Sequence, residues 1–191
     1  MWVKSEYAGE LAVLSAWVSM LVPWNVAFLT KAPFDSTVVF LRFALFEVQF
    51  RFPSELVFDG QQLDVASALA ETYPGTHFLG DAFLALPTAA ITFYESPQLQ
   101  QAGLAATGGA LAFLAALALS VALYTREDAV ADALDGREVQ LMGTLLLAGA
   151  AGTAVATALY YLERGLVGTP IPVGVLVVGA LGAVLLRTER V

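Results

Sequence analysis

The chain of 191 residues lacks cysteine and has one histidine, His77. The absence of cysteine excludes disulfides, thiolate metal sites and thiol catalysis. A single histidine cannot build a multi-histidine metal, haem or di-iron site. We therefore expect the protein to carry no cofactor and no metal ion.

Basic residues are also scarce. Lys and Arg total 9 against 17 Asp and Glu, for a net charge of -8, and only Lys4 and Lys31 are lysines. This balance argues against a nucleic-acid partner, which needs basic surface. An acidic, lysine-poor composition suits a cell with high internal salt, because carboxylates hold hydrated cations where charge screening is nearly complete. An acidic protein from an ordinary cell is the alternative.

Apolar residues, in contrast, are abundant. They make up 58% of the chain, and the mean hydropathy is +0.73. A helix of about 20 apolar residues matches the bilayer's hydrocarbon core of about 30 Å. The four longest apolar stretches therefore predict a single membrane domain of the all-α class. Its expected partner is the lipid bilayer. The four transmembrane helices are predicted at about 9–29, 98–124, 139–162 and 168–187.

The N-terminal run WVKSEYAGELAVLSAWVSMLVPWNV covers Trp2 to Val26. It resembles the start of a family of small uncharacterised multi-pass membrane proteins from halophilic archaea, and the segment FLRFALFEVQFRF is similar to that family more weakly. The resemblance implies a membrane location and a halophilic source. The family has no assigned activity, so the resemblance transfers no catalytic residue.

Residues 31–96 are predicted to form a small extracytoplasmic insert between helices 1 and 2, built from a β-hairpin and a short helix. The segment FEVQFRF alternates strictly, as a strand does, and the preceding VVFLRFALF is expected to extend it. Asp59-Gly60 predicts a two-residue hairpin turn, and Asp64 an N-cap for a short helix from Val65 to Thr72. The apolar face of the predicted strand is a candidate partner surface, made of Phe46, Val48, Phe50 and Phe52.

The run from His77 to Tyr94 is ambiguous because Asp81 and Pro87 interrupt its apolar residues. We expect a helix that lies at the outer membrane interface, with a re-entrant segment or a fifth span as the alternatives. Asp81 follows His77 by four residues, and the pair is predicted to make only a local contact.

Small residues recur at four-residue intervals in the second and third predicted spans. Ser96-Pro97 predicts the start of the second span, and Asp135-Gly136 a turn before the third. Small side chains let helix backbones approach closely. The predicted packing residues are Gly108, Ala112, Ala116, Ser120, Ala148, Gly152 and Ala156.

Basic residues predict the orientation of the spans. Lys4, Arg126, Arg137, Arg187 and Arg190 fall on the side of both termini, whereas the other short loop offers only Arg164. Because cytoplasmic loops are enriched in Lys and Arg, we expect a multi-pass protein of the cell membrane with cytoplasmic N- and C-termini.

The apolar interiors of the predicted spans hold no ionisable residue, whereas transporters and pumps usually need one. We therefore expect no enzyme, but a structural or accessory protein that binds another membrane protein or itself. The alternative is a transporter or channel for a small neutral or lipidic solute, which would pass along Asn25 and the Ser and Thr residues of the helix seam.

Overall fold

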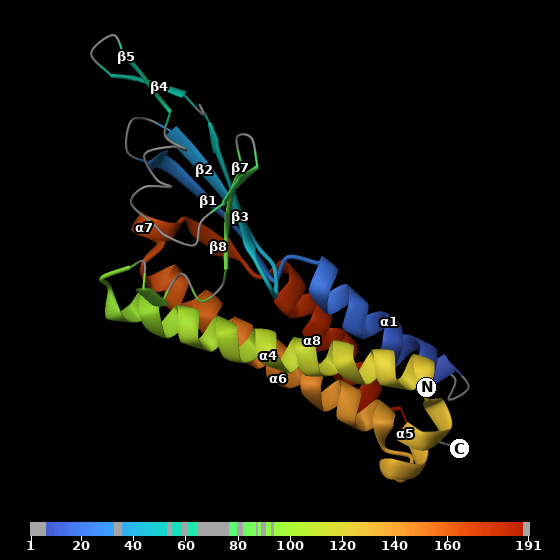
Figure 1. The fold of residues 1–191 in the computed structure, drawn as a ribbon. Helices are drawn as coiled ribbons and strands as arrows, with labels where there is room; N and C mark the ends of the chain where they lie inside the picture. Colours follow the sequence, from blue (N-terminus) through green and yellow to red (C-terminus); the bar gives the residue numbers. More distant parts are fainter. Residues whose placement is uncertain are drawn as a thin grey trace.

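The computed structural model describes residues 7–32, 36–52, 55–58, 61–64, 77–79, 82–86, 88, 91–92 and 94–188. A layer of helices carries a β-sheet at one end (Figure 1). The helices are α1 (Ala8–Leu21), α4 (Pro97–Thr125), α5 (Glu127–Ala133), α6 (Glu138–Leu162), α7 (Arg164–Val167) and α8 (Val173–Leu186). The strands are β1 (Asn25–Ala32), β2 (Ser36–Arg42), β3 (Glu47–Phe52), β4 (Glu55–Phe58), β5 (Gln61–Asp64), β6 (His77–Leu79), β7 (Ala82–Ala85) and β8 (Thr169–Ile171).

The prediction of an all-α protein with four transmembrane helices is wrong. Six strands form an antiparallel sheet in the order β6-β7-β3-β2-β1-β8, and β4 and β5 form a separate pair. Within the described residues, only α4 and α6 are long and apolar enough to cross a bilayer. α1 and α8 have 14 residues each, so each covers only about 21 Å of a hydrocarbon core of about 30 Å. A multi-pass bundle of full-length helices is therefore not what this chain forms.

The error in the first predicted span lies in its second half. The helix ends at Leu21, and residues from Asn25 onward form β1, which pairs with β2 on one side and β8 on the other. Pro23 cannot donate a helical hydrogen bond, and an apolar run does not by itself distinguish a helix from a buried strand. The fourth predicted span fails in the same way, because its first residues form β8.

The predicted insert is only part of a larger sheet. The strand over FEVQFRF is confirmed as β3, but VVFLR belongs to a separate strand, β2, and the chain reverses between them. The hairpin around Asp59-Gly60 is confirmed by the pairing of Phe58 with Gln61. The helix predicted from Val65 to Thr72 lies outside the described residues. Asp64, its expected N-cap, ends β5.

The predicted interfacial helix from His77 to Tyr94 is also wrong at its start, where the antiparallel strands β6 and β7 form. Tertiary pairing with β3 accounts for this outcome, since β7 continues the sheet. Asp81, the expected neighbour of His77, lies outside the described residues.

The helical layer (α1, α4, α6 and α8) follows the sequence more closely. Ser96 precedes Pro97 at the start of α4, as predicted. The turn before α6 is also confirmed, because Asp135 and Gly136 have positive φ angles of 52° and 72°. Both chain termini lie at the α5 end of the layer, opposite the sheet (Figure 1).

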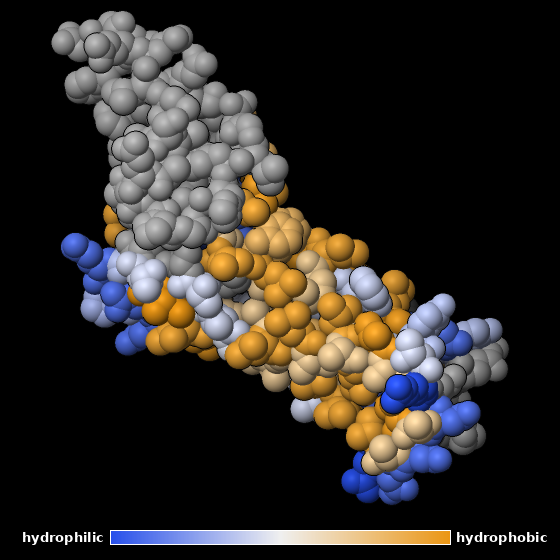
Figure 2. Space-filling model, in the orientation of Figure 1, coloured by the Kyte–Doolittle hydropathy of each residue, from blue (hydrophilic) through white to orange (hydrophobic). Residues whose placement is uncertain are grey.

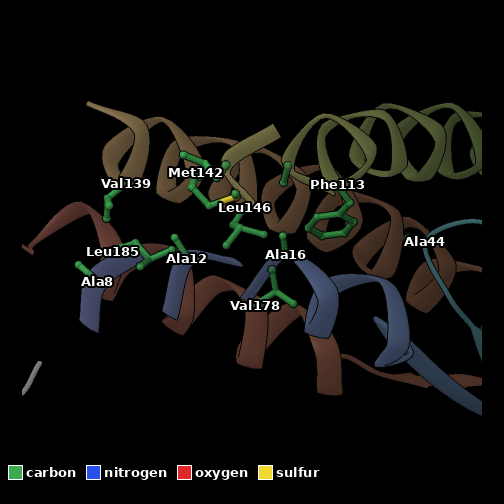
Figure 3. Close-up of a cluster of buried hydrophobic side chains, with 12 residues drawn as sticks. Ala8, Ala12, Ala16, Ala44, Phe113, Val139, Met142, Leu146, Val178 and Leu185 are labelled. Carbon is green, nitrogen blue, oxygen red and sulfur yellow. The ribbon is translucent and has the colours of Figure 1, made fainter. Parts of the chain in front are cut away.

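A cluster of buried side chains joins the four helices (Figure 3). Alanines dominate the contribution of α1, and larger side chains come from α4, α6 and α8. The cluster is made of Ala8, Ala12, Ala16, Ala44, Phe113, Ala116, Leu123, Val139, Met142, Leu146, Val178 and Leu185. Ala44 is the one member that comes from the sheet, from the turn between β2 and β3, so the sheet shares the core of the helices.

Candidate functional site

Three polar residues form one row across the sheet, at the end that faces the helices. Asn25 of β1 is the register partner of Arg42 in β2, and Arg42 is the partner of Glu47 in β3. Directly opposed residues of an antiparallel sheet point to the same face. The pairing therefore gathers an amide, a guanidinium and a carboxylate on the face that we call the inner face, with Ala27, Val38 and Phe40.

Arg42 is the centre of this row. It is 2% exposed, its Nε donates to Glu47 Oε2 at 2.5 Å, and its Nη1 donates to Asn25 Oδ1 at 3.2 Å. Burial lowers the pKa of the guanidinium, whereas the Glu47 carboxylate and the phenol groups of Tyr160 and Tyr94 raise it, and the net pKa lies above its ordinary value. Arg42 is therefore a permanent positive charge inside the protein.

Two further contacts complete the polar row. The Glu47 Oε1 accepts a hydrogen bond from Gln49 Nε2 at 2.6 Å. On the other side, Asn25 Nδ2 donates to Thr157 Oγ1 of α6 at 3.4 Å, and that hydroxyl donates to the Thr153 carbonyl at 2.8 Å. The chain of bonds thus runs from β3, through β2 and β1, to α6.

Aromatic rings enclose the guanidinium. Its Cζ lies 4.2 Å from the ring centroid of Tyr160 in α6 and 4.8 Å from that of Phe40. Trp24 stacks on Tyr160 with centroids 6.3 Å apart, and its Nε1 donates to the Phe43 carbonyl at 3.0 Å. Cation–π contacts of this kind contribute roughly 0.5–2 kcal/mol, with the larger values where water is excluded.

Two glycines fix the backbone beside the same junction. The N–H of Gly174, at the start of α8, donates to the Pro23 carbonyl at 3.1 Å, and a Cβ there would lie 2.6 Å from that oxygen. Gly168 has φ +78°, and a Cβ on it would lie 2.7 Å from the carbonyl carbon of Phe28. No other residue type would permit these approaches without a shift of the backbone.

The arrangement is suited to fastening rather than to chemistry on a ligand. Arg42 donates to two protein acceptors and is covered by two rings, so its positive charge is compensated by groups of the protein itself. A buried ion pair of this kind contributes little net stability against an apolar replacement, but it penalises any arrangement that separates the partners. The row therefore fixes how the sheet sits on α6. Among the described residues, no three His, Asp or Glu side chains gather where they could hold a metal ion.

The predicted packing residues fall in different surroundings. Gly152 lies in the α4–α6 contact, where an added Cβ would be 3.0 Å from the Ala105 carbonyl oxygen, whereas nothing described lies within 4 Å of a Cβ on Gly108. The neighbouring Gly109 lies at the close contact instead, because a Cβ added to it would be 2.9 Å from the Gly149 carbonyl oxygen. Of the other predicted packing residues, Ala116, Ser120 and Ala156 are buried, Ala112 is half-buried and Ala148 is exposed.

The predicted partner surface divides in two. Val48, Phe50 and Phe52 lie on the face of the sheet opposite the polar row, which we call the outer face, whereas Phe46 precedes β3 and belongs to the turn after β2. The outer face is apolar on every central strand, and its side chains are exposed or half-buried. By register it comprises Val26, Phe28, Thr37, Val39, Leu41, Val48, Phe50, Phe52, Leu84, Thr169 and Ile171.

Residues 1–190 match the model of a family of unknown function, DUF7549. The chain belongs to this family. Its membership confirms that the chain is one of an uncharacterised family, as the N-terminal resemblance implied. No curated protein matches the chain.

Sequence reasoning missed Arg42. Its signal was present, because Val38, Phe40 and Arg42 alternate along one strand and so share a face, which places a charge in line with two core residues. A buried charge needs a partner, and Glu47 follows after a turn of four apolar residues. Thr157 could not have been found in this way, because 132 residues separate it from Asn25.

Proposed function

We propose that the protein is a non-catalytic membrane protein that holds its sheet at the outer surface of the cell membrane. There the sheet binds another membrane protein or a second copy of the chain. One observation carries the proposal. The helices of the layer approach one another closely at small residues such as Gly109 and Gly152, and large apolar side chains are exposed along the outside of all four helices, where a water-soluble protein would carry polar ones.

The exposed side of the layer supports a lipid environment. In α4 and α6, only 33% of the most apolar 18-residue window is buried. Figure 2 shows hydrophobic residues over the middle of the layer and hydrophilic residues toward its two ends. The large apolar side chains exposed on the four helices include Leu14, Trp17, Leu21, Leu104, Leu111, Val121, Val155, Leu176 and Val184.

Charge supports one orientation in the membrane. Exposed Arg126, Arg137 and Arg187 lie at the α5 end of the layer, and exposed Arg164 lies near the sheet. By the bias of Lys and Arg toward the cytoplasm, the α5 end with both termini faces the cytoplasm and the sheet faces outward.

The outer face of the sheet supports the binding role. Exposed apolar surface of this extent is unusual on a monomer in water and often marks a contact with another protein. The buried polar row holds the sheet in a fixed position on α6, so that a partner would meet a preformed surface. The transporter alternative stays a prediction, and Asn25, its proposed lining residue, has both ends of its amide bonded to protein groups.

A charge placed on the exposed helix surface tests the membrane part. Leu111 is 62% exposed on α4, and Leu166 is 58% exposed on α7. In the bilayer core an arginine costs about 2.5–3.5 kcal/mol, so Leu111→Arg should sharply reduce the protein recovered in alkali-washed membranes, whereas Leu166→Arg should not. If both variants accumulate like the parent, or if the parent itself is extracted by alkali, the helical layer does not face lipid.

Recovery of the tagged protein after mild crosslinking tests the binding part. The experiment should be done on native membranes at high salt, because the acidic, lysine-poor composition suits a protein that works at high salt. We expect a stoichiometric membrane partner or a crosslinked dimer, and a loss of that product in Phe50→Ser/Phe52→Ser with membrane levels unchanged. A parent protein recovered as an uncrosslinked monomer would refute the binding role.

A further inference from the structure

The turn between β2 and β3 joins the sheet to the interior of the helical layer. Its four residues, Phe43 to Phe46, are all apolar. Ala44 is 1% exposed and belongs to the buried cluster of the helices. In Figure 3 it lies beyond Ala16, at the end of the row that Ala8, Ala12 and Ala16 make along α1. The turn therefore continues the packing of α1 past the end of that helix.

The length of α1 leaves room for the turn within a bilayer. Its 14 residues cover about 21 Å, which leaves about 9 Å of a 30 Å hydrocarbon core without helix on this side. α8 begins at the same level, because its Gly174 and Val175 N–H groups donate to the carbonyls of Pro23 and Trp24. α4 and α6 continue beyond this level. The β2–β3 turn lies in the gap that the two short helices leave.

Three backbone groups of the turn are bonded within the protein. Its Phe43 N–H donates to the Phe46 carbonyl at 2.8 Å, and the Phe43 carbonyl accepts from Trp24 Nε1 at 3.0 Å. The two charges that flank the turn, Arg42 and Glu47, form an ion pair with each other. Non-helical backbone is tolerated at membrane depth where it is buried against protein, and Ala44 holds the turn in such a position.

The turn also presents apolar surface outward. Leu45 and Phe46 are 39% and 36% exposed, and the Phe46 ring stacks on Phe43 with centroids 4.7 Å apart. Leu21, the last residue of α1, is exposed as well. We infer that the β2–β3 turn is inserted into the outer leaflet, where Leu45 and Phe46 contact the acyl chains of lipids. This inference rests on the proposed membrane embedding of the helical layer.

Depth-dependent quenching can test the inference, since the chain has no cysteine and a single introduced thiol can be labelled uniquely. We would make Leu45→Cys, Leu111→Cys and Phe52→Cys, attach an environment-sensitive fluorophore, and reconstitute each protein in phosphatidylcholine vesicles with lipids brominated along the acyl chain. The probe at Leu45 should be quenched about as strongly as the probe at Leu111. The probe at Phe52, at the far end of β3, should be quenched by aqueous iodide instead.

The three probes separate the possible failures. Quenching by brominated lipid at Leu111 but only by iodide at Leu45 would overturn the inserted turn and leave the membrane embedding intact. Iodide quenching at Leu111 would overturn the proposed function itself. Phe46→Cys provides a second position in the turn, and an unfolding temperature equal to that of the parent shows that each labelled variant is folded. Quenching of the Phe46 probe by iodide alone, in folded protein, would overturn the inference in the same way.

Discussion

Replacing Arg42 by methionine tests whether the buried polar row fastens the sheet to the helices. Methionine keeps the apolar length of the side chain but leaves the Glu47 carboxylate, largely buried at 17% exposed, without its cation. Removal of one partner from a buried pair costs about 3–5 kcal/mol of unfolding free energy. For a chain of this size each kcal/mol lowers the melting temperature by about 2–4 °C, so Arg42→Met should melt roughly 6–20 °C below the parent.

A second substitution isolates the contribution of the unpaired Glu47 carboxylate to this loss of stability. In Arg42→Met/Glu47→Gln no charge remains to be compensated, so we expect most of the lost stability to return, because neutral replacements of buried pairs are often tolerated. Arg42→Lys should have a melting temperature between those of the parent and Arg42→Met. A lysine ammonium keeps the positive charge but cannot match the planar guanidinium, which donates to both Glu47 and Asn25.

Thermal unfolding of purified protein in one detergent, followed by circular dichroism, gives the comparison. Arg164→Met is the matched control, because Arg164 is exposed and a surface substitution is usually worth less than about 0.5 kcal/mol. If Arg42→Met and Arg164→Met have the same melting temperature, the polar row does not hold the sheet on the helices. The same follows if the double variant is no more stable than Arg42→Met.

Two pairs of glycines give further predictions in the same assay. Gly109→Ala should lower the melting temperature by the cost of overpacking, about 1–3 kcal/mol, whereas Gly108→Ala should be neutral or stabilising, since its Cβ meets nothing described within 4 Å; equal effects would refute the α4–α6 geometry. Gly168→Ala should destabilise by more than about 1 kcal/mol because of its positive φ and its contact with β1, whereas Gly165→Ala, with open space around its Cβ, should not; a neutral Gly168→Ala would place that loop elsewhere.

Local signals in the sequence predicted the parts of the fold that local physics decides. The long apolar helices α4 and α6, the start at Ser96-Pro97 and the turn at Asp135-Gly136 follow from residue type and spacing alone. β3 was also predictable, because strict alternation over six residues has no helical equivalent.

The parts that failed depend on pairing between distant segments. Val26 to Leu29 are apolar enough for a membrane helix, and only the strands on either side make them a strand. β8 is three residues long, too short for any periodic signal. The polar row was only partly predictable. The burial of Arg42 could be suspected from the strand face that it shares with Val38 and Phe40, but its contact with the Tyr160 ring depends on where α6 packs.

The order of the strands has a consequence for synthesis of the chain. β1 is paired on one edge by β2, its neighbour in sequence, and on the other by β8, which follows it by about 140 residues and, at about 5–20 residues per second, leaves the ribosome roughly 7–28 s later. Until then the backbone groups of Val26 to Phe28 that pair with β8 form an open strand edge, which invites pairing with other chains. The nascent protein needs that edge to be shielded until β8 has been made.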